Sequence, residues 1–496
     1  MTRRTLLPLL IFFLASAPLF AGVVSLDLIP PETIDDGGLV WRVVVTNGAA
    51  TAFENTRLYF WEANGTQRLV TFPDTCERTY GEQVVCTESF AAGETREIRF
   101  VTEPTGGPTR FMGATEIFAS NEHAFEAQTT VFGRTFTVTS VEDDGPGSLR
   151  QAILDINREC AKTGPCGITF NIAGSVPDSG WFAIQPKRGL PDFTAADVFI
   201  DGRSQTRYSA DTNPHGPEVV LDGSMVSEGN GLTFRGSGDV RGIAIEGFPA
   251  NGIEALGSNL VLDEVRVVAN GGRGVELIGG FARVEKSILS GNRHAGGVFW
   301  TAEDVLVLRN VVSDNGASGL FFHNPAMRWR FADVRDNVIE NNAHAGIALT
   351  PFAAGNFALN VMRGNHNGAI DVALDGPTPE TTRGLPGQGG IMGPPIIESA
   401  RYANGVTTIT GHANTRAGGT YVASTLYFYA NTTGRADADE VIGSVVRFGG
   451  NGTFTLTVDR DLRGKFITAS EYTVWIYNWD DPAPGTSELS AAVEVR

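Results

Sequence analysis

Residues 267–275 read VVANGGRGV, and related stretches recur at near-regular intervals along the chain. They are IEGFPANGI (245–253), LSGNRHAGGV (289–298), VSDNGASGL (312–320), IENNAHAGI (339–347) and MRGNHNGAI (362–370). Five of the stretches share an asparagine at one aligned position: Asn270, Asn292, Asn315, Asn342 and Asn365. These asparagines are 22, 23, 27 and 23 residues apart. A repeat of this length predicts a solenoid in which each repeat forms one layer.

The residues around the asparagines indicate which solenoid forms. Apolar positions alternate with polar ones and lack the three-and-four spacing of a helical repeat. A small-residue column follows the asparagines: Gly252, Gly274, Gly297, Gly319, Gly346 and Ala369. An apolar column comes next: Ile253, Val275, Val298, Leu320, Ile347 and Ile370. Each coil therefore offers short strands, stacked about 4.8 Å from the next coil.

A second asparagine column supports the same alignment: Asn310, Asn337 and Asn360. A side-chain amide carries two donor hydrogens and one acceptor oxygen, so stacked asparagines can bond from coil to coil inside a turn. We therefore predict an all-β fold built on a parallel β-helix, right-handed by the usual preference of parallel crossovers.

This repeat resembles the right-handed β-helix family that includes pectate-lyase-like enzymes, carbohydrate-binding proteins and sugar hydrolases. The resemblance covers about half of the chain and implies the fold. It implies little about activity, because one fold hosts many chemistries.

The length and the net charge limit the number of domains and the class of partner. The 496 residues leave room for about three domains. The formal net charge of −18 argues against nucleic acid as a partner, because phosphate binding needs a basic surface.

The first residues and the cysteines indicate the compartment. Met1 to Ala21 read as a secretion signal, with two arginines, an apolar run and small residues at the end. No later run is long enough to span a bilayer as a helix. We expect a secreted or cell-surface protein, with the periplasm as an alternative. In such a compartment the paired cysteines predict two local disulfides, Cys76 with Cys86 and Cys160 with Cys166.

After the expected signal, the chain divides into three parts. Residues 22–133 alternate like sandwich strands, and their VVCTESFAAGETREIRF line resembles a bacterial surface immunoglobulin-like repeat domain. Residues 134–394 form the capped β-helix, entered by SLRQAILDIN with Ser148 as the expected helix N-cap. The phrase DDGPGSLRQAI resembles the entry of secreted β-helix proteins with CSLREA-type caps. Residues 395–496, after a Gly- and Pro-rich stretch, resemble the C-terminal β-sandwich that follows such β-helices.

Two outward columns carry candidate chemistry. The first holds Glu254 and Glu276, a pair suited to glycoside chemistry, continued by Phe299 and Phe321 as a strip for sugar rings. The alternative is a solvated face with two incidental acids. The second column holds Arg241, Asp263 and Glu285, which provides the acids and base of a lyase or, alternatively, a surface ion-pair row. No cofactor is indicated, and calcium would be expected only of a lyase.

The C-terminal strand YTVWIYNW provides another candidate binding surface. Alternation places Trp475, Tyr477 and Trp479 on one face, as it places Tyr427 and Tyr429 on one face of TLYFYA. An exposed aromatic face would suit sugar rings, and the alternative is that both faces are covered.

These patterns predict a protein that binds or adheres to extracellular polysaccharide or a cell-surface glycan. The alternatives are a lyase or glycoside hydrolase acting on acidic polysaccharide, and a structural spacer. The oligomeric state is not indicated.

Overall fold

The computed structural model describes residues 24–496 with gaps. The gaps are residues 30, 32–37, 63–64, 80, 106–109, 120–121, 132, 161–164, 175, 258, 301, 303, 324–330, 351–354, 373, 375–392, 414–421, 449–451 and 476–484. The expected secretion signal lies outside the described residues. No helix in the described part of the chain is long and apolar enough to cross a bilayer.

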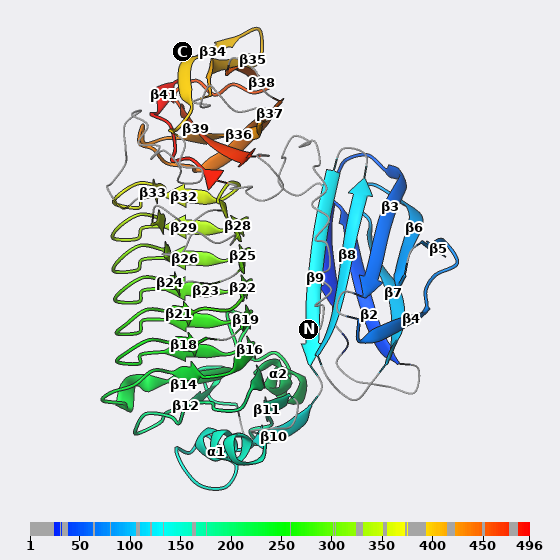
Figure 1. Cartoon of the computed structure of the whole chain (residues 1–496), viewed down its shortest axis with the longest axis vertical. Coiled ribbons are helices and arrows are strands. Elements are labelled where there is room, and N and C mark those ends of the chain that lie inside the picture. Colours follow the sequence, from blue (N-terminus) through cyan, green and yellow to red (C-terminus); the bar gives the residue numbers. More distant parts are fainter. Residues whose placement is uncertain are drawn as a thin grey trace, which may run out of the picture.

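The repeats form a right-handed parallel β-helix of three sheets, which stands upright in the left half of Figure 1, below the C-terminal sheets. The nine-stranded sheet contains β10 (Arg134–Val138), β11 (Cys166–Phe170), β13 (Asp197–Asp201), β16 (Ser237–Arg241), β19 (Leu260–Asp263), β22 (Ala282–Glu285), β25 (Asp304–Leu308), β28 (Phe331–Arg335) and β31 (Gly355–Asn356). The eight-stranded sheet contains β12 (Phe182–Ile184), β14 (Val219–Asp222), β17 (Ala244–Glu246), β20 (Arg266–Val268), β23 (Ile288–Ser290), β26 (Val311–Ser313), β29 (Val338–Glu340) and β32 (Val361–Arg363). The seven-stranded sheet contains β15 (Leu232–Phe234), β18 (Ile253–Leu256), β21 (Val275–Ile278), β24 (Gly297–Trp300), β27 (Leu320–His323), β30 (Ile347–Leu349) and β33 (Ile370–Val372).

Both predicted asparagine ladders are present. In the first, each Nδ2 donates to the Oδ1 of the next asparagine, for example at 3.1 Å from Asn292 to Asn315 and 2.9 Å from Asn315 to Asn342. In the second, Asn310 donates to Asn337 at 3.0 Å and Asn337 to Asn360 at 2.8 Å. All of these asparagines are buried, so the ladders satisfy backbone groups inside the turns as well as one another.

One coil is shifted by a residue from the predicted alignment. Gly296 occupies the small-residue column, because its Cβ position faces the Asn315 amide as that of Gly274 faces Asn292. Gly297 then pairs with Val275, and Val298 pairs with Glu276. The double glycine offered two alignments, and the prediction chose the wrong one.

A helix closes the N-terminal end of the coils, as expected. Helix α1 (Leu149–Glu159) begins at Ser148, whose Oγ accepts a hydrogen bond from the Gln151 backbone N–H at 3.2 Å. Its apolar face buries Ile153 and Ile156 in the core of the β-helix. This covers the backbone edge that an open solenoid would expose. A second helix, α2 (Arg203–Ser209), and the short 3₁₀ helix η1 (Gly223–Met225) were not predicted.

The C-terminal sheets close the other end. One contains β34 (Ile396–Ala403), β35 (Val406–His412) and β38 (Thr453–Val458). The other contains β37 (Glu440–Phe448), β36 (Val422–Asn431), β39 (Phe466–Trp475), β40 (Gly485–Thr486) and β41 (Val493–Glu494). The two sheets share their own apolar core.

Several polar contacts join these sheets to the last coils. Thr486 Oγ1 donates to the Gly355 carbonyl at 2.8 Å and accepts from the Phe357 N–H at 3.1 Å. Glu488 Oε1 accepts from the Val372 N–H at 2.9 Å. These side chains supply partners for backbone groups that would otherwise form an open edge.

The tyrosines of β36 are buried, contrary to an exposed aromatic face. Tyr429 is fully buried and its hydroxyl accepts from the Leu359 N–H at 3.2 Å. Tyr427 packs in the same core as the coils, and burial raises its pKa to about 12. The end of the β-helix covers this face of the sheet, which was the alternative left open above.

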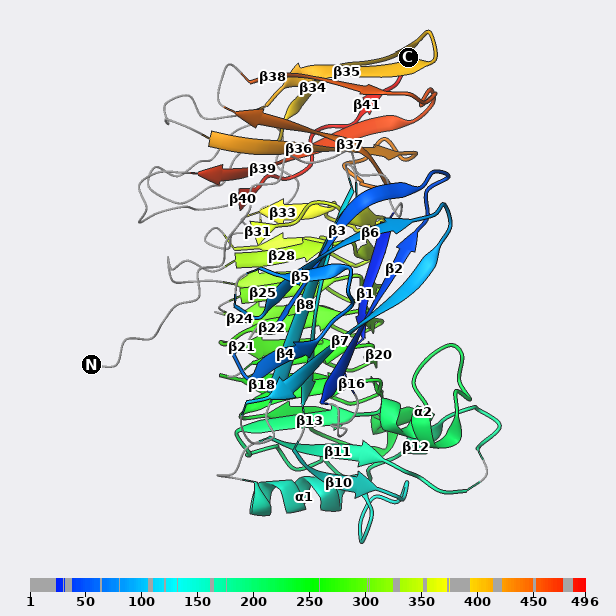
Figure 2. The same cartoon turned by 90° about the vertical axis from the view of Figure 1, so that its right-hand side faces the viewer.

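The N-terminal part of the chain forms two antiparallel sheets. One contains β1 (Val24–Ile29), β2 (Leu39–Asn47), β7 (Thr95–Pro104) and β4 (Gln67–Thr71). The other contains β5 (Cys76–Arg78), β6 (Gln83–Phe90), β3 (Phe53–Glu62), β8 (Arg110–Ala119) and β9 (Glu122–Val131). These sheets lie alongside the nine-stranded sheet (Figures 1 and 2), where Lys286 Nζ is 3.6 Å from Asp27 Oδ1.

Both predicted disulfides form. Cys76 bonds Cys86 across β5 and β6, and Cys160 bonds Cys166 between the end of α1 and β11. The second bond ties the capping helix to the first coils.

Candidate functional site

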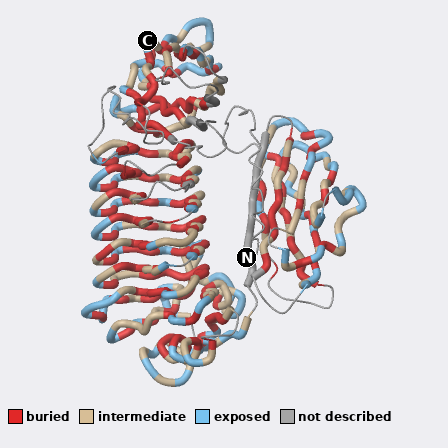
Figure 3. The backbone as a smooth tube through the Cα atoms, viewed as in Figure 1, coloured by how far each residue is buried: buried red, intermediate tan, exposed pale blue. Residues whose placement is uncertain are grey.

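The register of the seven-stranded sheet brings the predicted acid pair together. Glu254 of β18 lies directly opposite Glu276 of β21, and the same row continues through Val298, Phe321 and Ala348. Adjacent parallel strands lie about 4.8 Å apart. Burial varies along the coil as Figure 3 shows, and in this row Glu276 is buried whereas Glu254 is half-buried.

Phe299 does not belong to this row, so its assignment as an exposed sugar-stacking residue was wrong. It points inward and is only 2% exposed, stacked on Phe322 with ring centroids 5.1 Å apart. The one-residue shift at Gly296 and Gly297 inverts the faces of this strand, because side chains alternate along it.

Three donors hold Glu276 in place. Its Oε2 accepts from Asn251 Nδ2 at 2.7 Å and forms an ion pair with Arg273 Nη1 at 2.7 Å. Its Oε1 accepts from the Trp300 indole N–H at 2.8 Å. These bonds from three sides fix the orientation of the carboxylate.

An aromatic group extends from this carboxylate. The Trp300 ring meets Phe321 edge-to-face with centroids 5.6 Å apart, and His323 at 4.7 Å. The Arg273 guanidinium lies over the Trp300 ring, 5.8 Å from its centroid. Trp300, Phe321 and His323 are all partly exposed, so the group presents ring surface to solvent.

Glu254 has a different environment from Glu276. Burial raises the pKa of the Glu254 carboxyl above its ordinary value, and the nearby Glu276 and Asp192 charges raise it further. Its Oε2 accepts one hydrogen bond, from Asn230 Nδ2 at 3.1 Å, which partly offsets the shift. The two carboxyls of the pair therefore differ in burial and in their hydrogen-bond partners. We call Glu254, Glu276, Arg273, Trp300, Phe321 and His323 the acid–aromatic face.

The second predicted row, on the nine-stranded sheet, is also in register. Arg241, Asp263 and Glu285 lie opposite one another on β16, β19 and β22. Each is buried and engaged by charges of opposite sign. Arg241 donates two hydrogen bonds to the Asp239 carboxylate, from Nε at 2.8 Å and from Nη2 at 3.0 Å. Glu285 forms ion pairs with Arg283 and Arg309.

This row matches the ion-pair alternative better than a lyase site. The Asp239 carboxylate raises the Arg241 pKa further above its already high value, against the effect of burial. A proton acceptor needs a pKa near the working pH, so Arg241 is unsuited to act as a base.

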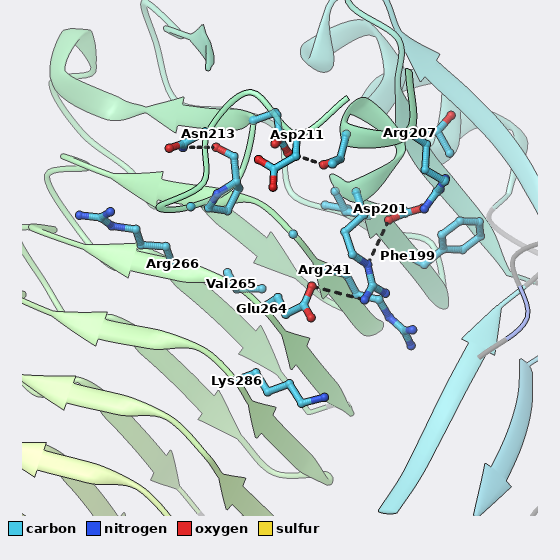
Figure 4. Close-up of a pocket in the computed structure, with 18 of the residues that line it drawn as sticks. Phe199, Asp201, Arg207, Asp211, Asn213, Arg241, Glu264, Val265, Arg266 and Lys286 are labelled. Atoms are coloured by element: carbon cyan, nitrogen blue, oxygen red, sulfur yellow. Dashed lines mark hydrogen bonds and ion pairs between the residues drawn. The ribbon is translucent and has the colours of Figure 1, made fainter. Parts of the chain in front are cut away.

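Beside this row lies a cavity of about 810 Å³. Its walls come from the nine-stranded sheet, from Arg266 and Ile288 of the eight-stranded sheet, and from α2, the 211–218 loop and the end of β1. Figure 4 labels several of its charged residues, among them Arg207, Arg266 and Lys286. Charged groups at this junction could not be located from the repeat pattern, because the loop and β1 lie outside the repeats.

Other sequence candidates do not form a cluster. No group of three or more His, Cys, Asp or Glu side chains suited to a metal ion occurs in the described ranges. Trp475 ends β39, and only its backbone position is described. Tyr477 and Trp479 lie outside the described residues.

Five residues of the site were not predicted: Arg273, Trp300, His323, Asn230 and Asn251. Arg273 and Asn251 lie on turns just before their strands, where the repeat pattern does not indicate which side chains have a function. Trp300 comes directly after Phe299 on β24, so the alignment that turns Phe299 outward also turns Trp300 inward and hides it.

Comparison with known proteins supports the fold. Residues 230–381 match the family described as the right handed beta helix region. A search of curated protein sequences gave no significant match.

Two solved structures show weak similarity. The GH20 exo beta-N-acetylglucosaminidase of Vibrio harveyi aligns at 12% identity and a TM-score of 0.16, over 21% of this chain and 17% of that chain. The A-module of the Azotobacter vinelandii mannuronan C-5 epimerase AlgE4 aligns at 11% identity and a TM-score of 0.17, over 48% of this chain and 94% of that chain. At these TM-scores neither similarity bears on activity. The stacked coils and the family match together make the described residues between 230 and 372 a right-handed parallel β-helix.

Proposed function

We propose that this is an exported protein that binds polysaccharide through the acid–aromatic face. The observation that carries the proposal is the Trp300 group: a partly exposed indole, packed edge-to-face on Phe321, whose N–H is bonded to Glu276. Aromatic rings stack on the C–H faces of sugars while neighbouring carboxylates and guanidinium groups bond their hydroxyls.

The location of the face supports the same proposal. It lies along stacked strands about 4.8 Å apart, on which Glu254 pairs with Glu276 and Trp300 pairs with His323. An extended chain of sugars can contact several coils at once. The two disulfides fit an oxidising compartment outside the cytoplasm, which agrees with the expected secretion signal.

A direct binding measurement tests the proposal. The full mature chain is run in native gels containing a panel of neutral and acidic polysaccharides, and retardation is compared among variants. Trp300→Ala and Phe321→Ala are expected to weaken retardation by at least fivefold. Tyr208→Ala provides the control, because Tyr208 is 53% exposed and lies outside this face. Unchanged retardation in both aromatic variants would reject the proposal.

A second candidate function is glycoside hydrolysis. The observation that favours it is the unequal acid pair: the Glu254 pKa is raised, whereas Glu276 accepts bonds from Arg273 and Trp300. In retaining glycosidases, two carboxyls about 5 Å apart divide the roles of proton donor and nucleophile. Here Glu254 would protonate the leaving oxygen while a Glu276 carboxylate oxygen bonds to the anomeric carbon, and water would then release the sugar from Glu276.

Reducing-end assays on the same panel separate this candidate from binding alone. If a substrate is cleaved, Glu254→Gln and Glu276→Gln are each expected to reduce the rate by about 10²–10⁴-fold while binding persists. Full activity in both variants would place the chemistry elsewhere. Absence of cleavage, together with retained binding, would leave polysaccharide binding as the function.

A further inference from the structure

The cavity of about 810 Å³ beside the nine-stranded sheet is a second, separate feature. It lies at a different sheet from the acid–aromatic face, at the junction of the N-terminal sheets with the first coils. Its volume is in the range of pockets that hold small organic ligands and exceeds what a single inorganic ion needs.

Basic and acidic side chains line it in equal number, whereas the whole chain carries a formal net charge of −18. Five basic residues line it: Arg203, Arg207, Arg241, Arg266 and Lys286. In Figure 4, Arg207, Arg266 and Lys286 lie on three different sides of the space.

Two of the acidic side chains of the cavity are buried. Asp239 is fully buried beneath Arg241, and Glu218 is buried with a hydrogen bond from Thr206. Arg207 pairs with Asp201 at 2.5 Å, and its side chain stays 43% exposed. Asp239 therefore holds Arg241 in place, whereas the Arg207 side chain, paired with the half-buried Asp201, remains accessible.

Two of the cations are held loosely. Arg266 is exposed and forms no ion pair with any described residue. Lys286 has a single long contact, 3.6 Å from Asp27, and its side chain is 30% exposed. Such groups retain most of their capacity to pair with an incoming anion.

Acceptors lie between the cations. Glu264 lines the cavity with a side chain 48% exposed, and Asp211 is also exposed. Carboxylates among cations disfavour a dense polyanion and suit a ligand that carries both hydroxyl groups and spaced negative charges.

We infer that this cavity binds an acidic oligosaccharide, with Arg266 and Lys286 pairing with carboxylate or sulfate groups on its rings. The neighbouring acids accept hydrogen bonds from sugar hydroxyls. The site is distinct from the acid–aromatic face and would give the protein a second contact with glycan on another side of the coil.

Calorimetric titration of the full mature chain tests this inference. The probes are a trimer of galacturonic acid, its uncharged methyl ester and a sulfated galactose trimer. The variant is Arg266→Gln combined with Lys286→Gln, and the control is Arg293→Gln, an exposed arginine on the turn before β24. Trp300→Ala is measured in parallel.

The double variant is expected to weaken binding of the charged trimer at least tenfold, with no change in Arg293→Gln or Trp300→Ala. The methyl ester should bind more weakly than the acid, and whichever charged trimer binds more tightly identifies the recognised group. Equal binding of acid and ester, unchanged affinity in the double variant, loss only in Trp300→Ala, or no binding of either charged trimer at millimolar concentration would each overturn the inference.

Discussion

The asparagine ladder allows a stability effect to be worked out bond by bond. The Asn315 side chain donates through Nδ2 to Asn342 Oδ1 at 2.9 Å and to the Leu289 carbonyl at 3.0 Å. Its Oδ1 accepts from the backbone N–H and Nδ2 of Asn292, both at 3.1 Å. Replacing Asn315 by Leu removes all four bonds at once.

Not every partner is left unsatisfied by this change. Asn292 Nδ2 keeps the Val267 carbonyl at 3.1 Å, and Asn342 Oδ1 keeps the backbone N–H of residue 315. The Leu289 carbonyl and the Asn292 N–H lose the bonds that the side chain supplied. At about 1–3 kcal/mol for each buried group, part of which the apolar leucine offsets, Asn315→Leu should destabilise the coils by about 3 kcal/mol.

Denaturant unfolding followed by far-UV circular dichroism measures this effect, and hydrogen exchange at the Asn292 amide locates it. Arg293→Leu is the matched control, because it adds the same side chain on an exposed turn and should change stability by less than about 0.5 kcal/mol. Equal unfolding midpoints for Asn315→Leu and the wild type, with an unchanged Asn292 exchange rate, would refute the ladder as a stabilising element.

Three further predictions follow from named contacts. Because burial raises the Glu254 pKa in the folded protein, the folded state binds this proton more tightly than the unfolded state, and stability falls as the pH rises from the unfolded pKa through the folded pKa. Glu254→Gln should therefore raise the free energy of unfolding at pH 7 and leave it unchanged below about pH 4. An equal effect at both pH values would contradict this. Thr486→Val should increase hydrogen exchange at the Phe357 amide, because this N–H donates to Thr486 Oγ1, while exchange in β21 stays the same; equal protection of Phe357 would show that the C-terminal sheets do not seal the coil through this residue. Thiol titration of the denatured, unreduced protein should find no free thiol, because the four cysteines are paired; two or more thiols would reject at least one bond.

The sequence predicted the coils because their determinants are local and repeated. Each ladder asparagine bonds to the next one along, so the spacing of Asn292, Asn315 and Asn342 directly reports the stacking. The same regularity failed at Gly296 and Gly297, where two adjacent glycines fit the column equally well and only packing against the Asn315 amide decides between them.

The candidate sites were harder to predict than the coils. Glu254 and Glu276 were recognised because they share a column, whereas Arg273 reaches Glu276 from a turn whose sequence does not repeat. The cavity depends on Lys286 lying near Asp27, a residue far away in the chain. Contacts of this kind come from tertiary packing, and no local pattern encodes them.

The corners of the coil differ in how much extra chain they accept. The ladders fix the turns that follow the eight-stranded and nine-stranded sheets, but the connection from the seven-stranded to the nine-stranded sheet varies. It spans residues 279–281 after β21 and residues 324–330 after β27, where the ladder spacing lengthens to 27 residues. That longer connection begins next to His323 of the acid–aromatic face. Insertions at this corner leave the stack undisturbed, so the surroundings of the face can diversify without any change in the scaffold that positions it.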